Sequence, residues 1–66
     1  MRIKLKTFRG SQNLKQKGMA EKIGVSLRGY QAVELGERNG NIEFWEKLKN
    51  AFNLDWNTVG ELMKDE

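Results

Sequence analysis

The sequence contains no cysteine, no histidine and no proline. Without cysteine and histidine, the 66-residue chain has neither disulfides nor the usual zinc ligands to stabilise it. A domain of this size buries only about 60% of the surface that its unfolded chain exposes, so its stability should be modest. Its core must come from the hydrophobic residues, which make up 38% of the chain and include two Trp, three Phe and one Tyr. We expect one small helical domain over residues 1–66, with no metal and no cofactor.

Long hydrophobic runs are also missing. No N-terminal stretch has the length of a signal-peptide core, and no segment approaches the roughly 20 apolar residues that cross a bilayer. The lack of cysteine fits a reducing compartment. We therefore expect a soluble, cytoplasmic protein without membrane contact.

The same absences argue against catalysis. No histidine or cysteine is available as a base or nucleophile, and no serine has a suitable base partner. Glu43 and Glu46 are spaced as neighbours on a helix, where such a pair is most often a solvated face. We predict that the protein is not an enzyme, and we expect no small-molecule ligand.

Positive charge is concentrated at the start of the chain. Residues 21–40 have no net charge, and residues 41–66 carry three basic residues against six acidic ones. Residues 1–20 contain no acidic residue, and their basic residues are Arg2, Lys4, Lys6, Arg9, Lys15 and Lys17. This end suits a polyanion such as nucleic acid, although a solvated basic terminus has the same pattern.

Glycine and short polar clusters divide the chain into five segments whose apolar residues have helical spacing. The predicted helices span about residues 3–11, 16–23, 27–34, 42–52 and 56–64. In the first, Ile3 and Leu5 alternate with lysine as in a strand, but Leu5 and Phe8 together favour a helix. Such short helices are unstable alone, so they must pack together as an all-α bundle.

Polar residues suited to N-capping precede the predicted helices. Ser26, Asn41 and Asp55 can each accept a hydrogen bond from an unsatisfied backbone N–H at the start of the third, fourth and fifth helices. Asn13 and Gln16 indicate a start for the second helix that is similar to a capping box.

The segment "QKGMAEKIGVSLRGYQAVE" (16–34) predicts two short helices joined by a glycine-containing turn, which is a helix-turn-helix. It resembles the lambda-repressor-like (Cro/XRE) helix-turn-helix family. The residues that match the family pattern are Gln16, Met19-Ala20, Ile23-Gly24-Val25-Ser26, Tyr30, Val33-Glu34 and Gly36. With "IEFWEKLKNAFNL" (42–54) as the fourth helix, the resemblance covers about residues 3–62. Lys15, Gly18 and Gly40 depart from the pattern.

The resemblance implies how the third helix is held to the body. Tyr30 and Val33 would face the core. Arg9 and Glu34 occupy positions that in this family often form a buried or half-buried ion pair between the first and third helices. Two independent surface charges are the alternative. If the pair forms, losing one partner would leave an uncompensated charge.

In the family, the third helix lies in the DNA major groove with its first residues at the base edges. When this arrangement is carried over to the present sequence, the base-reading positions are Leu27, Arg28, Gly29, Gln31 and Ala32. Arg28 is the leading reader because its planar fork matches guanine O6 and N7, with a phosphate contact or solvation as alternatives. Leu27 meets a thymine methyl group or covers the helix junction. Gly29, which is unfavourable in a helix by about 1 kcal/mol relative to alanine, would let the backbone approach the bases.

Phosphate contacts are expected on both sides of that helix. Gln16 and Lys17 stand at a helix N-terminus, where backbone N–H groups and the dipole favour an anion. Arg38 lies across the third helix in the loop "GERNGN" (36–41). The full predicted set is Lys15, Gln16, Lys17, Ser26, Arg38 and Asn39. Solvation explains each of these side chains singly as well, but their arrangement around one helix pair favours phosphate binding.

Proteins of this family usually bind as two-fold dimers on half-sites about one helical turn, roughly 34 Å, apart. The junction of the fourth and fifth helices is the expected dimer surface. Its candidate residues are Trp56, Leu62 and Met63, each of which can instead complete the monomer core. The residues expected in the core are Trp45, Phe52 and Val59.

Together these features predict a transcription regulator that binds double-stranded DNA sequence-specifically as a homodimer, in the manner of a small phage-type or mobile-element repressor. The alternative is a protein–protein adaptor or antitoxin-like module that keeps the fold with little specific DNA binding. Gly29 and Ala32 keep this alternative open, because they offer little to a base edge.

Overall fold

The computed structural model describes residues 1–65, and five helices follow one another along them. They are α1 (Ile3–Ser11), α2 (Gln16–Ile23), α3 (Leu27–Leu35), α4 (Ile42–Phe52) and α5 (Trp56–Met63). The described residues contain no strand, so the all-α prediction is confirmed. Residues 3–11 are helical rather than extended, because helical spacing places Leu5 in the core and turns Phe8 toward it. Within residues 1–65, no helix is long and apolar enough to span a bilayer.

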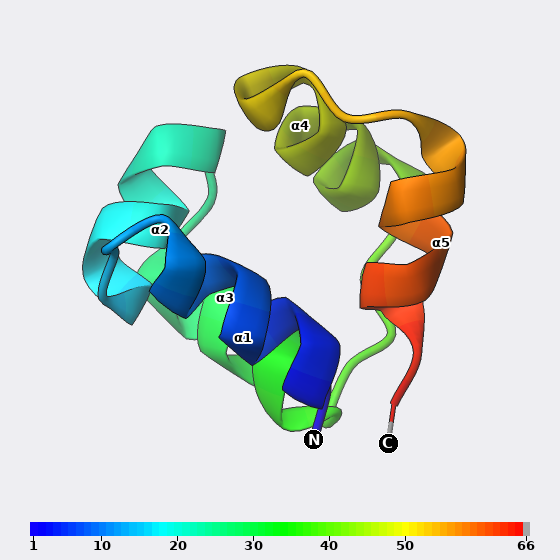
Figure 1. Ribbon diagram of the computed structural model, residues 1–66. Helices are drawn as coiled ribbons and strands as arrows, with labels where there is room; N and C mark the ends of the chain where they lie inside the picture. Colours follow the sequence, from blue (N-terminus) through cyan, green and yellow to red (C-terminus); the bar gives the residue numbers. More distant parts are fainter. Residues whose placement is uncertain (66) are drawn as a thin grey trace.

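The helices form two groups that share one core. α2 and α3 pack against each other, and α1 lies against α3 (Figure 1). α4 packs against α2, and α5 packs against both α4 and α1. Residues 1 and 65 lie side by side, with the Met1 ammonium 2.8 Å from Asp65 Oδ1. One face of α3 is thereby covered by neighbouring helices, and its opposite face remains available to a partner.

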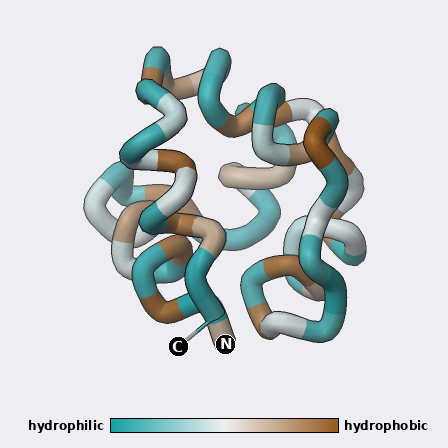
Figure 2. The backbone as a smooth tube through the Cα atoms, turned by 90° about the vertical axis from the view of Figure 1, so that its right-hand side faces the viewer, coloured by the Kyte–Doolittle hydropathy of each residue, from teal (hydrophilic) through white to brown (hydrophobic). Residues whose placement is uncertain are grey.

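All five helices contribute to a single hydrophobic core. Figure 2 shows hydrophobic residues in short stretches between hydrophilic ones, as expected for helices with one buried face. Trp45 and Val59 are buried, and Phe52 is half-buried, with its ring centroid 5.0 Å from that of Phe8. The buried hydrophobic residues are Leu5, Met19, Ala20, Ile23, Tyr30, Val33, Phe44, Trp45, Leu48, Val59 and Leu62.

Side-chain caps begin the last three helices. Ser26, Asn41 and Asp55 each accept a hydrogen bond from the backbone N–H three residues further on. The capping-box start expected for α2 is wrong. Asn13 lies in the preceding turn with φ 58°, and Lys15 occupies the N-cap position with no side-chain cap hydrogen bond. The first turn of α2 therefore keeps backbone N–H groups without a side-chain acceptor.

The turn between α2 and α3 is set by a left-handed glycine. Gly24 has φ 82°, a conformation in which a β-carbon is strained. The backbone N–H groups of Gly24 and Val25 both donate to the carbonyl of Ala20, at 2.9 and 3.0 Å. Ala20 is buried and small, which suits the close packing of α2 against α3. This turn fixes the angle at which α3 leaves α2.

Candidate nucleic-acid interface

A buried carboxylate, Glu34, holds α3 to α1. It is 2% exposed. Arg9 Nε donates to Glu34 Oε2 at 2.9 Å, and Arg9 Nη2 donates to Glu34 Oε1 at 3.2 Å. The Tyr30 hydroxyl donates to Glu34 Oε2 at 2.6 Å. Arg9 and Glu34 are thus joined at two points in the interior, the geometry in which a guanidinium and a carboxylate interact most strongly.

The ionisation of this cluster follows from its hydrogen bonds. Burial on its own raises the pKa of a carboxyl, but hydrogen bonds from Arg9, Tyr30 and Gln16 outweigh it, so the pKa of Glu34 lies below its usual value. Burial and the hydrogen bond to Glu34 raise the pKa of Tyr30. At neutral pH, Glu34 is therefore ionised and accepts only, while Tyr30 remains a donor.

A chain of hydrogen bonds leads from Glu34 to the surface of α3. Because the carboxylate only accepts, Gln16 presents its amide nitrogen to it, with Nε2 3.0 Å from Glu34 Oε1. Gln16 Oε1 then accepts from Gln31 Nε2 at 3.1 Å. The side chain of Gln16, which we expected at a phosphate, is turned toward these two residues instead. This side chain thus links Glu34 to Gln31.

The side of α3 that faces away from the core carries most of the predicted base-reading residues. Leu27 and Arg28 are exposed, and Gln31 and Ala32 are half-buried beside them. Leu35 is exposed on the same side, two turns after Leu27. It was missed because the helix was expected to end one residue earlier. These five residues are hereafter the outer face of α3.

Gly29 does not lie on the outer face. Together with Val33 and Phe44 it lines an open groove of about 450 Å³ between α3 and α4. A β-carbon at position 29 would lie 2.9 Å from Ser26 Oγ, the atom that caps α3. The structure therefore gives this glycine a different role from the predicted one: it makes room for the N-cap hydroxyl.

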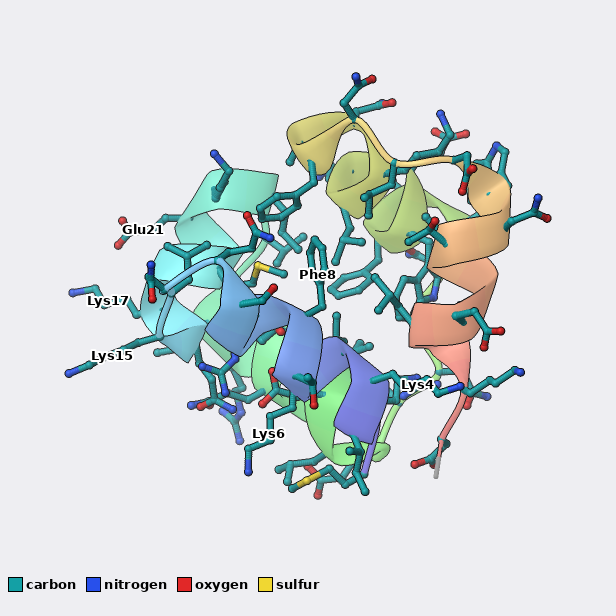
Figure 3. All side chains as sticks on the ribbon, in the orientation of Figure 1. Lys4, Lys6, Phe8, Lys15, Lys17 and Glu21 are labelled. Atoms are coloured by element: carbon teal, nitrogen blue, oxygen red, sulfur yellow. The ribbon has the colours of Figure 1, made fainter. Side chains whose placement is uncertain are left out.

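The basic residues of the first third of the chain divide into two classes. Arg2 is buried, Arg9 is paired with Glu34, and Lys4 donates to a carboxylate of α5 at 3.1 Å. Figure 3 shows Lys4 directed toward α5, whereas Lys15 and Lys17 project outward from the start of α2. Three of the six basic residues in this part of the chain are exposed and form no ion pair within residues 1–65: Lys6, Lys15 and Lys17.

Arg38 and Asn39 lie in the loop between α3 and α4, and both are exposed. The Arg38 side chain forms no ion pair within the described part of the chain. Arg38 lines both the groove beside Gly29 and a hollow that includes Arg28. It therefore stands next to the outer face, on the opposite side from the start of α2.

The expected dimer surface is only partly on the outside of the molecule. Leu62 is 5% exposed and belongs to the core, so its placement on that surface is wrong: α5 packs this side chain against α1 and α4. Met63 is half-buried against the core. Trp56 is 45% exposed, and Lys49 Nζ lies 5.5 Å from its ring centroid.

A model of the helix-turn-helix family matches residues 5–59, which run from within α1 through α4 and the loop of Arg38 to the start of α5. The chain belongs to the Cro/C1-type helix-turn-helix family. This is a family of DNA-binding transcription regulators, which are not usually enzymes. No curated protein and no solved structure shows a significant match to the chain. In this helix-turn-helix domain, α2 and α3 are the two helices of the motif.

Proposed function

We propose that the protein is a sequence-specific transcription regulator that reads the major groove of double-stranded DNA with the outer face of α3. The arrangement of α3 carries this proposal. Its inner side is held by the buried Glu34, while its outer face is open, with exposed cations at the start of α2 and at Arg38. A rigid helix with cations on two sides suits a groove bounded by phosphates.

Arg28 is the residue that we assign to base recognition. Its exposed guanidinium can donate to guanine O6 and N7 together, a contact that discriminates between bases by about 1–3 kcal/mol. Leu27 and Leu35 offer apolar contacts to thymine methyl groups, and Ala32 offers van der Waals contact only. Gln31, with one N–H held by Gln16, keeps its other N–H and its Oε1 for a base edge.

Phosphate binding is assigned to both sides of α3. Because no side chain caps α2, the backbone N–H groups of its first turn can donate to a phosphate oxygen, with Lys15 and Lys17 beside them. Arg38 and Asn39 would contact the backbone on the other side. Ser26 Oγ already accepts a hydrogen bond from the Gly29 N–H at 3.0 Å but can still donate its own hydroxyl proton.

We further propose that the protein binds DNA as a homodimer and represses transcription in the manner of a phage-type or mobile-element repressor. The molecule measures 25 × 23 × 22 Å, so one copy spans less than the roughly 34 Å between half-sites. The exposed ring of Trp56 supports a dimer surface at the start of α5. Repression by occupying a promoter needs only the DNA-binding surface.

The decisive experiment is selection of bound sequences from a random duplex pool, followed by affinity measurements over a range of salt. Arg28→Ala should abolish the preference for the selected sequence, whereas Lys17→Ala should weaken all duplexes alike and reduce the salt slope by about one. Lys22→Ala is the matched control, because Lys22 Nζ lies over the Phe52 ring, and it should change little.

A protein–protein adaptor or antitoxin-like module is the second candidate. The two exposed leucines of the outer face, Leu27 and Leu35, would also suit an apolar partner surface. If every duplex binds weakly with a flat salt response, the regulator proposal is wrong and this candidate replaces it.

A further inference from the structure

Arg2 is buried, and among residues 1–65 no carboxylate forms an ion pair or a hydrogen bond with its guanidinium. It is 4% exposed, and its guanidinium donates to four backbone carbonyls. Nε donates to Met63 O at 2.9 Å, and Nη1 donates to Val33 O at 2.6 Å and to Arg38 O at 2.9 Å. Nη2 donates to Asn39 O at 3.4 Å. One side chain thus joins three segments that are far apart in the sequence.

The positions of these carbonyls explain how a guanidinium without an ion pair is held there. Val33 lies in the last turn of α3, and Met63 is the last residue of α5. The negative ends of two helix dipoles therefore converge on the guanidinium of Arg2. Its central carbon also lies 5.7 Å from the centroid of the Trp45 ring, within range of a cation–π contact. The planar guanidinium of arginine has five N–H donors and can reach all four carbonyls, whereas the compact ammonium of lysine cannot.

Two of the four carbonyls belong to the loop that carries the proposed phosphate contacts. Arg2 holds the carbonyls of Arg38 and Asn39, and Trp45 Nε1 donates to the same Asn39 carbonyl at 3.1 Å. The backbone of this loop is therefore fixed from inside the molecule. The Arg38 side chain itself is exposed and lies beside the outer face of α3.

We propose that Arg2 is a positioning residue for DNA binding: by holding the backbone at Arg38 and Asn39, it keeps the Arg38 guanidinium where a phosphate passes α3. This inference rests on the proposed function. A loop without this support would have to be ordered on binding, at the expense of backbone entropy. Affinity would fall for every duplex, and the preference among sequences would remain.

Arg2→Lys tests the inference, because it keeps the charge but removes the fork. Binding to a selected and to an unrelated duplex is measured over a range of salt, at a temperature where circular dichroism shows the variant folded. We expect about a tenfold loss on both duplexes and a salt slope shallower by about one, the change expected when one phosphate contact is lost. Arg38→Ala should weaken the original protein by about as much, roughly tenfold, but have little further effect in the Arg2→Lys background.

Two further variants separate positioning from general destabilisation. Val59→Ala removes core packing in α5, and it should leave the salt slope and the full effect of Arg38→Ala unchanged. Trp45→Phe removes the indole N–H that donates to the Asn39 carbonyl. It should reduce the salt slope by about as much as Arg2→Lys does. If Arg2→Lys does not fold, Trp45→Phe provides the same test.

The outcomes distinguish the two proposals. If the original protein shows no salt-dependent DNA binding, the proposed function is wrong. If it binds DNA but Arg2→Lys and Trp45→Phe retain its salt slope and the full effect of Arg38→Ala, the inference about Arg2 is overturned while the proposed function stands.

Discussion

Arg2 and Arg9 both connect the N-terminal segment to the end of α3, but they meet different kinds of partner. Arg9 pairs with the carboxylate of Glu34 and also donates to the Leu14 carbonyl at 2.9 Å. The hydrogen bonds of the Arg2 guanidinium go only to carbonyls, at the ends of two helices and in a loop. A guanidinium packed inside the protein can therefore be neutralised by one titratable charge or by several fixed dipoles. The Arg2 and Arg9 sites should therefore lose their stabilising effect under different conditions.

Removing the carboxylate should have the largest effect. Glu34→Ala leaves the half-buried Arg9 without its counter-charge, so we expect a loss of about 3–5 kcal/mol in the free energy of unfolding. This is comparable to the whole stability of so small a domain, at roughly 0.05–0.15 kcal/mol per residue, so the variant should be largely unfolded. Urea titration followed by circular dichroism measures it. Glu37→Ala, at an exposed position, is the control, and a loss below about 1 kcal/mol in Glu34→Ala would contradict the assigned role.

Removing the other arginine should have a smaller effect. Arg2→Met deletes hydrogen bonds from a charged donor, each worth about 1.5–3 kcal/mol, but it leaves no charge buried, and the loop carbonyls can bind water instead. We expect a net loss of about 2–3 kcal/mol in the same titration. A loss greater than that of Glu34→Ala would reverse the ranking of the two sites.

Acid should distinguish the two sites without a change at either arginine. The pKa of Glu34 is lowered in the folded state from its usual value of 4.5, so its contribution to stability is complete above about pH 4.5 and is lost as the pH falls through the folded-state value. Near Arg2, the pKa of Asp65 is also lowered, but chiefly by its hydrogen bond with the Met1 ammonium, which Arg2→Met leaves in place. Unfolding free energies between pH 7 and pH 2 should therefore fall in parallel for the original protein and Arg2→Met. The free energy of unfolding of Glu34→Gln should depend less on pH. If its pH profile is identical to that of the original protein, ionised Glu34 does not stabilise the fold.

An uncharged contact that holds α3, the N-cap of Ser26, should produce the smallest effect. Gly29→Ala improves helix propensity by about 1 kcal/mol, but its β-carbon would displace the capping hydroxyl, which is worth about as much. We expect the free energy of unfolding to change by less than about 0.5 kcal/mol. In Gly60→Ala, where nothing lies within 4 Å of the added carbon, the full gain should appear. Equal gains in the two variants would show that position 29 has no steric constraint.

Local patterns were sufficient to predict the helices. The spacing of apolar residues and the caps at Ser26, Asn41 and Asp55 depend on neighbours within a turn or two, so their consequences can be worked out without the fold. The same holds for the left-handed turn at Gly24. The capping box at Asn13 failed because a left-handed residue there ends the turn before α2 begins.

The candidate site was less predictable, because its details depend on contacts between distant residues. Gln16 was expected to contact a phosphate, but the ionised Glu34 determines where its amide points. Leu62 was a candidate for the dimer surface or for the core, and the packing of α5 against α1 places it in the core. Neither outcome follows from spacing along one helix.

The class of fold, the helix-turn-helix and the residue types of α3 follow from the sequence alone, because they depend on short-range periodicity and residue type. Which basic residues remain open to a polyanion depends on how the helices pack. Arg2 counted as one of six N-terminal cations, yet folding encloses it among four carbonyls. Every residue has a carbonyl, so nothing in the residue types indicated which four would surround it; their convergence is a property of the packed helices.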